Sequence, residues 1–283
     1  MPSGLPQSPL KPSKPHNLKI GIPVLNRGDL LAELIASIDL PAEVLIVVNR
    51  IGPVDPSVEQ HVAQLERKPP PHLRITVHWT EGNLGVSGSW NKIIDHFQGD
   101  CVIANSDICF SKGVLECARK QIRDRREIVL QHLYAAACFY VTETFTSYLG
   151  WYDENFYPAY HEDQEMTLRS RALKVRRCQF PGINKTNIFH AGSQTLKSAP
   201  GRLQQYIGAA NKLHGRYLKD RWGPIPKDWR LPPEKKAPFD DLSLHPADWT
   251  LDLAFRKQIA KLCRHFTGFE CPILFHRPKG GLQ

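Results

Sequence analysis

Two acidic sites in this chain have the residue types needed for chemistry on a phosphate-bearing substrate. Asp107, in Asn105-Ser106-Asp107, directly follows the apolar segment Cys101–Ala104, and the pair Glu162-Asp163 closes an aromatic-rich loop. A carboxylate at a rigid strand end can bind a divalent cation that bridges two phosphates. A carboxylate within hydrogen-bond reach of a hydroxyl can take its proton as that hydroxyl attacks. Together the two sites indicate transfer of a group from a diphosphate to an alcohol.

Both sites also have a simpler explanation. Asn-Ser-Asp after a strand is commonly a turn, and acidic residues favour the first turn of a helix because the helix dipole stabilises them. The helix explanation does not account for the aromatic residues just ahead of the acidic pair, which are Trp151, Tyr152, Phe156, Tyr157 and Tyr160. Aromatic faces beside carboxylates suit a sugar ring, so we predict a sugar-binding loop in which Trp151 and Tyr160 contact the acceptor.

Two further segments could contribute to the same site. His190 follows a short extended segment, where a neutral imidazole could complete a metal shell or contact a leaving diphosphate, although a lone histidine is usually structural. Residues 82–91 place small residues and free backbone amides at a helix start, which suits an anionic or hydroxylated ligand. This segment follows the third strand, and Asn49 rather than an acid ends the second, which argues against a dinucleotide-dependent dehydrogenase.

Strands and helices alternate along the first half of the chain, and a helix is expected to begin near Glu162. This order predicts an α/β fold with a mostly parallel sheet flanked by helices. Ligands of such sheets gather at the carboxyl ends of the strands, where Asn26-Arg27, Asn49 and Asp107 all fall. The predicted strands are residues 18–24, 44–48, 73–77, 101–104 and 131–141. Helices are predicted over residues 30–38 and 89–97, and another helical segment between them is ended by the prolines at 69–71.

The predicted domain organisation has three parts. Residues 1–16 are rich in Pro, Ser and Lys without an apolar stretch, so we expect a disordered leader rather than a secretory signal. Residues 17–222 would form the catalytic domain. The prolines between residues 223 and 246 indicate an extended arm, and residues 249–266 predict an amphipathic helix. We therefore expect residues 223–283 to pack on or beside the catalytic domain.

Charge and cysteine content limit the partners and the location. The net charge is +9, and the chain from Lys197 onward holds 16 Lys and Arg against 8 Asp and Glu. Such a basic part could attract phosphates, anionic lipids or nucleic acid, or simply be a solvated surface. Without a nucleic-acid-binding motif, nucleic acid is not expected.

No apolar run reaches the ~20 residues of a membrane span, and the seven cysteines form no Cys-x-x-Cys pair. The predicted location is cytoplasmic, with peripheral contact with an anionic membrane surface through the basic C-terminal part.

Taken in order, these segments resemble the family 2 glycosyltransferases with the GT-A fold. The likeness covers about residues 18–223, and its specificity comes from order and spacing rather than from one motif. The matching segments are residues 22–27, 47–49, 83–91, 105–107, 150–154, 162–163, 190 and 217–223.

The resemblance implies an inverting, Mn²⁺- or Mg²⁺-dependent transfer of a hexosyl or deoxyhexosyl group in glycan biosynthesis. The donor would be a nucleotide-sugar, and the acceptor a hydroxyl of a glycan or a lipid-linked molecule. Asp163 would be the base, with Glu162 beside it positioning the acceptor. Asp107 would be the metal ligand of the family's Asp-x-Asp site, and His190 would join it. The nucleotide-sugar would be bound by Pro23, Asn26, Arg27, Asn49, Asn83, Gly85, Asn91, Asn105 and Ser106.

Two positions depart from the family pattern. Asn49 stands where the second strand usually ends in Asp, which puts the usual nucleotide preference in question, and Asn105 replaces the first acid of Asp-x-Asp, which weakens the expected metal affinity. Two alternatives stay open. A nucleotidyltransferase of similar fold should carry a Gly-, Arg- and Lys-bearing loop after the first strand, which Gly28-Asp29 matches poorly. A non-catalytic sugar- or nucleotide-binding descendant would not need both Asp107 and Asp163.

Overall fold

The computed structural model describes residues 17–124, 129–184, 186–225 and 253–269, with only the backbone at residues 195, 196 and 253. The predicted leader and most of the predicted proline-rich arm lie outside these residues. Within the described parts of the chain, no helix has the length and apolar character needed to cross a membrane.

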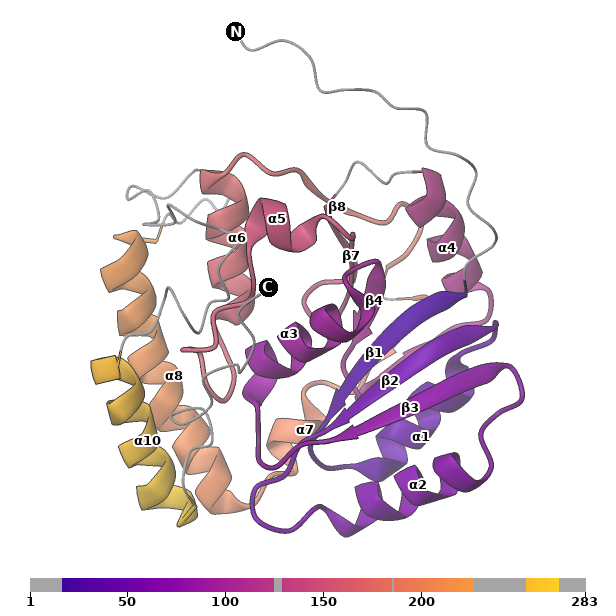
Figure 1. Ribbon diagram of the computed structural model, residues 1–283. Coiled ribbons are helices and arrows are strands. Elements are labelled where there is room, and N and C mark those ends of the chain that lie inside the picture. Colours follow the sequence, from indigo (N-terminus) through magenta and orange to yellow (C-terminus); the bar gives the residue numbers. More distant parts are fainter. Residues whose placement is uncertain (1–16, 125–128, 185, 226–252, 270–283) are drawn as a thin grey trace, which may run out of the picture.

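A seven-stranded sheet forms the centre of the molecule, in the order β3-β2-β1-β4-β7-β6-β8 (Figure 1). The first four strands in the chain run parallel, β7 is antiparallel to both β4 and β6, and β8 is parallel to β6. The predicted mostly parallel α/β fold is therefore confirmed. The strands are β1 Leu18–Val24, β2 Ala42–Val48, β3 Leu73–Trp79, β4 Cys101–Ala104, β6 Leu130–Tyr134, β7 Cys138–Val141 and β8 Arg177–Gln179.

The prediction of one strand over residues 131–141 was wrong, because this segment is the hairpin of β6 and β7. Its turn is closed by a hydrogen bond from the amide of Ala137 to the carbonyl of Tyr134, and Ala135 adopts a φ of 44°. Three consecutive alanines make the turn, so none of the Gly, Pro or Asn residues that mark turns is present.

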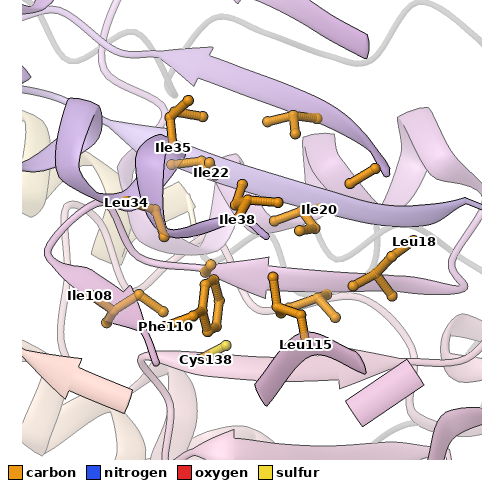
Figure 2. Packing of buried hydrophobic residues seen from close by; sticks show 14 of the residues in the cluster. Leu18, Ile20, Ile22, Leu34, Ile35, Ile38, Ile108, Phe110, Leu115 and Cys138 are labelled. Atoms are coloured by element: carbon orange, nitrogen blue, oxygen red, sulfur yellow. The ribbon is translucent and has the colours of Figure 1, made fainter. Parts of the chain in front are cut away.

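Helices cover both faces of the sheet. The first face packs against α1 Gly28–Ser37, α2 Pro56–Arg67 and α4 Val114–Asp124 through alternate residues of β1, as Figure 2 shows for Ile20 and Ile22. The second face packs against α3 Gly85–Phe97, α5 Phe145–Leu149 and α6 Glu162–Ala172. Gly21 lets α3 approach closely, because a Cβ there would lie 2.0 Å from a side-chain carbon of Ile93.

A second, two-stranded sheet pairs β5 Ile108–Phe110 with β9 Ile188–His190. The strands are antiparallel, and Ile108 is directly opposite His190. This register brings residue 190 next to the segment between β4 and β5, although the two are far apart in the sequence.

A third layer consists of α8 Gly201–Trp222 and α10 Leu253–Thr267, which lie side by side at one edge of the molecule with the short helix α7 Gln194–Lys197 nearby (Figure 1). Residues 217–223, which matched the family motif, form the end of α8 and its cap, and Trp222 is fully buried. The predicted helix at 249–266 is observed as α10, and residues 249–252 lie outside the described parts. Both helices contribute to one apolar cluster with Phe156 and Tyr157 of the aromatic-rich loop.

Candidate functional site

A pocket opens where β1, β2 and β4 end, at the carboxyl edge of the sheet. Eight residues predicted to bind the donor or the metal line it, and these are Pro23, Asn49, Asn83, Gly85, Asn105, Ser106, Asp107 and His190. Of the other lining residues, Val24 and Leu25 belong to the matching segment 22–27, and Val86 and Ser89 to the matching segment 83–91. The lining residues outside any matching segment are Pro158, Ala159, Ser193, Leu203 and Ile207. Leu203 and Ile207 come from α8, a helix that the sequence analysis did not predict, so only the tertiary structure places them in the wall.

The other predicted site residues lie outside this wall. Neither Glu162 nor Asp163 lines the pocket, but Ala159 does, and Glu162 is only three positions further along the chain. An extended chain of that length spans about 10 Å, so both carboxylates are carried by the segment that leaves the pocket wall. The remaining predicted residues that do not line the pocket are Asn26, Arg27, Asn91, Trp151 and Tyr160.

Asp107 and His190 face each other in the pocket. His190 Nε2 lies 3.4 Å from Asp107 Oδ1, and the two side chains are 19% and 4% exposed. The second carboxylate oxygen of Asp107 accepts a hydrogen bond from the amide of Gln194 at 3.1 Å. The ring of Tyr134 lies 5.5 Å from the His190 ring, centre to centre. The pairing of β5 with β9 therefore brings these two side chains together from segments that are far apart in the sequence.

The chemistry of this pair fits a hard divalent cation that is shared with a substrate. A carboxylate and an imidazole are ligands that Mn²⁺ accepts, while the described residues contain no group of three or more His, Cys, Asp and Glu side chains that could hold a metal. Two protein ligands leave most coordination positions to other oxygen atoms. A diphosphate in the pocket would supply them, so this donor set fits a substrate-borne cation better than a structural one.

Asn49 connects two of the segments that line the pocket. Its Nδ2 donates to Ser89 Oγ at 2.9 Å, and its Oδ1 accepts from the amide of Leu84 at 2.8 Å. The side chain is 4% exposed. Asn49 therefore joins the end of β2 to the start of α3 while also lining the pocket.

The start of α3 packs tightly against the loop segment of Tyr157 and Pro158. Gly85 has a φ of 72°, and a Cβ there would lie 2.8 Å from the Tyr157 ring and 2.9 Å from the Pro158 carbonyl oxygen. The amide of Gly85 donates to Asn83 Oδ1, and the amide of Val86 donates to the carbonyl of Pro158. The expectation of free amides at this helix start was therefore wrong for these two residues, because the loop and Asn83 use them.

Arg27 and Asn91 act on neighbouring segments rather than on the pocket wall. Arg27 adopts a left-handed backbone conformation, pairs with Asp29 through Nη2 at 2.6 Å, and donates to Ser198 Oγ at 3.3 Å. The hydrogen bond with Asp29 raises the pKa of Arg27. Asn91 is buried, donates to the carbonyl of Tyr152 at 2.9 Å and accepts from its amide at 2.9 Å. Asn91 thereby fixes the beginning of the aromatic-rich loop.

The aromatic-rich loop is mostly part of the core. Tyr152, Phe156 and Tyr157 are 3%, 0% and 3% exposed. Trp151 is half-buried against the apolar cluster that lies between the sheet and helices α3, α5 and α6. The expectation that the whole group of rings forms a sugar-binding surface was therefore wrong for the three buried ones. Tyr160 is 41% exposed and has a φ of 78°, so it projects from the loop next to the acidic pair.

A buried ion pair anchors the helix that carries the acidic pair. Arg169 is fully buried, and its Nη2 lies 2.5 Å from Glu165 Oε2, one helical turn away. Its Nη1 donates to the carbonyl of Leu149 at 2.9 Å and also to the carbonyl of Trp151. Arg169 therefore ties α6 to the aromatic-rich loop.

Glu162 and Asp163 have opposite environments. Glu162 is 8% exposed and, in the described parts of the chain, its Oε2 has no hydrogen-bond partner. Burial, with a smaller contribution from the charge of Asp163, raises the pKa of Glu162 to about 8. Asp163 is exposed, and its charge contributes to raising the pKa of the Arg177 guanidinium, although burial lowers that pKa overall. Asp163 is thus accessible to a molecule arriving from solvent, and Glu162 is not.

The sheet order and the strand-end pocket define an α/β protein with the GT-A fold. Solved glycosyltransferase structures share this architecture. The mannosyltransferase PcManGT from Pyrobaculum calidifontis, solved with GDP-Man and Mn²⁺, aligns with a TM-score of 0.54 at 14% identity over 94% of this chain and 80% of its own. GalNAc-T7, solved with UDP, GalNAc and Mn²⁺, aligns with a TM-score of 0.53 at 10% identity over 88% of this chain and 58% of its own. No protein-family model and no curated protein matches the sequence.

Proposed function

We propose that this chain is an inverting, divalent-metal-dependent glycosyltransferase of family 2 type that moves a hexosyl or deoxyhexosyl group from a nucleotide-sugar to a hydroxyl. The single observation that carries the proposal is the pair Asp107 and His190, 3.4 Å apart in the strand-end pocket. The GT-A fold and the carboxylates at the start of α6 support it. The metal-bearing, nucleotide-bound state of the two similar structures is consistent with the same chemistry here.

The donor would bind with its nucleotide between the ends of β1 and β2 and its diphosphate toward β4. Pro23, Asn49 and Asn83 line the first region, and Asn105, Ser106 and Asp107 the second. Asp107 and His190 would hold Mn²⁺ or Mg²⁺ against the diphosphate, where the cation offsets the negative charge that develops on the leaving group.

Lys197 is placed to add positive charge on the diphosphate side. Its Nζ lies 3.5 Å from the position that a Cβ on Gly192 would occupy. Gly192 immediately precedes Ser193, a lining residue of the pocket. An ammonium group beside a developing phosphate charge stabilises the transition state, most strongly where water is excluded.

Asp163 would act as the base. The acceptor oxygen attacks the anomeric carbon, the bond from that carbon to the diphosphate oxygen breaks with its electron pair leaving on the diphosphate, and the acceptor proton passes to the Asp163 carboxylate. Attack on the face opposite the leaving group inverts the anomeric configuration. Glu162 and the exposed Tyr160 would position the acceptor.

A basic surface on α8 and α10 would bring the protein to an anionic membrane that presents a lipid-linked acceptor. The two helices hold nine Lys and Arg against one Asp. Exposed basic residues recur at helical spacing on each, at Lys212, Arg216 and Lys219 and at Lys257, Lys261 and Arg264. Each Lys or Arg near an anionic leaflet contributes about 1 kcal/mol. We therefore propose a cytoplasmic location with peripheral contact at the membrane.

A panel of UDP-, GDP- and dTDP-sugars tests the proposal, with thermal shift and nucleotide release measured with and without Mn²⁺. We expect one donor class to raise the melting temperature in the presence of Mn²⁺ and to be turned over. Binding without turnover, with or without acceptor, would favour a non-catalytic sugar-nucleotide-binding protein. Release of pyrophosphate from a nucleoside triphosphate and a sugar phosphate would favour a nucleotidyltransferase.

A further inference from the structure

Helix α10 contacts the two sides of the site at its two ends. Near its start, Arg256 is 5% exposed, and its Nε donates to Asn155 Oδ1 at 2.7 Å. Just beyond its end, Phe269 lies against Gly52, where a Cβ would come within 2.6 Å of the Phe269 ring. With a rise of 1.5 Å per residue, the two contacts are about 20 Å apart. The sequence alone did not indicate that α10 contacts the site.

The Arg256 contact completes a buried polar network inside the loop that leads to Tyr160 and Glu162. Asn155 Nδ2 donates to Asp153 Oδ1 at 2.8 Å and to the Tyr217 hydroxyl at 3.0 Å. Arg221 Nη1 donates to Asp153 Oδ2 at 3.2 Å. Asp153 and Asn155 are 0% and 1% exposed. The middle of the loop is therefore held by α8 and α10, while Asn91 holds its beginning.

The Phe269 contact lies on the nucleotide side. Gly52 belongs to the turn after β2, three residues beyond the pocket residue Asn49, and has a φ of 73°. In the same turn, Arg50 Nε donates to the carbonyl of Glu81 at 3.0 Å, which ties it to the segment that leads to Asn83. Ile51 packs against the apolar cluster that α10 shares with α8.

A simpler function for α10 would be to cover the apolar side of α8. Phe255, Ile259 and Cys263 are buried in the shared cluster and would suffice for that. A cover does not require a buried guanidinium, because burying a charge is costly unless its hydrogen bonds are made. Nor does it require contact with Gly52, which is not part of α8. The two terminal contacts therefore call for a second explanation.

We propose that α10 is a strap that fixes the spacing between the donor side and the acceptor side of the site. Arg256 is the positioning residue for the loop that carries Glu162 and Asp163, and Phe269 is the positioning residue for the turn after β2. The proposal rests on the function proposed above. It predicts that the two ends of one helix control different kinetic parameters, which a helix that only covers α8 would not do.

Steady-state kinetics of the full chain, with the donor found in the panel, test the strap. Arg256→Gln should lower kcat about 10-fold or more while leaving the donor KM within about 2-fold, because a misplaced base costs rate rather than donor binding. Arg256→Lys should recover part of kcat. Phe269→Ala should raise the donor KM several-fold with little change in kcat. Gln258→Ala, exposed on the same helix, and Tyr148→Ala, an exposed aromatic on α5, are the matched controls and should match the wild type.

Equal changes in both parameters for both variants, or wild-type values for both, would overturn the strap. Should the wild-type chain transfer no sugar, the proposed function fails and hydrogen exchange decides the strap separately. Arg256→Gln should then speed amide exchange in residues 151–163 and spare residues 50–54, and Phe269→Ala should do the reverse. The same pattern in both variants, or no change in either, contradicts it.

Discussion

Glu162 and Asp163 are neighbours at the start of α6, yet burial raises the pKa of the Glu162 carboxyl to about 8 while Asp163 remains exposed to solvent. Tyr160 and His161, the two residues just before the helix, both adopt left-handed backbone conformations. At neutral pH Glu162 therefore favours its protonated form, and Asp163 is the side chain of the pair that is open to solvent.

The first prediction concerns the base. Asp163→Asn should lower sugar transfer by at least about 100-fold, the scale of general-base catalysis, and should leave nucleotide-sugar binding nearly unchanged. Donor affinity by calorimetry and turnover by nucleotide release measure the two effects. Wild-type turnover in this variant would show that the base has been assigned to the wrong residue.

The second prediction concerns stability and pH. The pKa of Glu162 rises from 4.5 in the unfolded chain to about 8 in the folded protein, so the folded state binds this proton more tightly. This tighter binding contributes to the free energy of unfolding fully below about pH 4.5. The contribution is lost as the pH rises toward 8, at about 1.4 kcal/mol for each pKa unit. Urea unfolding between pH 5 and 8 should show a weaker pH dependence for Glu162→Gln than for the wild type. Asp163→Asn leaves Glu162 buried, so this variant should keep most of the wild-type change in unfolding free energy with pH.

The third prediction concerns the metal. Asp107→Asn removes the charged ligand and should abolish the Mn²⁺-dependent thermal shift given by the donor. His190→Ala should raise the Mn²⁺ concentration needed for half-maximal activity by at least the roughly 10-fold that loss of an outer-shell partner costs. Ser193→Ala, which alters another lining residue without removing a ligand, is the control. An unchanged Mn²⁺ requirement in both ligand variants would contradict the assignment.

The fourth prediction concerns charge on the leaving group. Lys197→Ala should lower kcat about 10-fold or more, since it removes a cation from the diphosphate side, and Lys197→Arg should retain most of the activity. A matched change of an exposed lysine far from the site, Lys120→Ala on α4, should have no effect. Equal activity of the two alanine variants would remove Lys197 from the mechanism.

The fifth prediction concerns the membrane. Lys212→Glu with Lys219→Glu should weaken co-sedimentation with vesicles of phosphatidylcholine and phosphatidylserine about 10-fold or more. The same reversal on α4, Lys120→Glu with Arg123→Glu, should leave it unchanged. Wild-type protein that does not bind these vesicles at low salt would rule out the proposed surface.

Much of the fold could be predicted because its signals are local. The apolar runs of β1 and β4 match the predicted strands residue for residue, and the placement of Asn49 and Asp107 after their strands required only that parallel strands end at one edge. The long helix α8 was missed as an element, although its last residues were noticed as a motif. The β6–β7 turn was missed because alanines, rather than turn-forming residues, make it.

The sequence by itself determined the parallel strands that begin the sheet and the positions of Asn49 and Asp107 after two of them, because each depends on residues close together in the chain. Only the tertiary structure decided that His190 stands 3.4 Å from Asp107, since this requires β5 to pair with β9. It also decided which carboxyl of the acidic pair is buried, and that Arg256 reaches Asn155. These relationships depend on packing between distant segments, and no local pattern of residue types records which distant segments will meet.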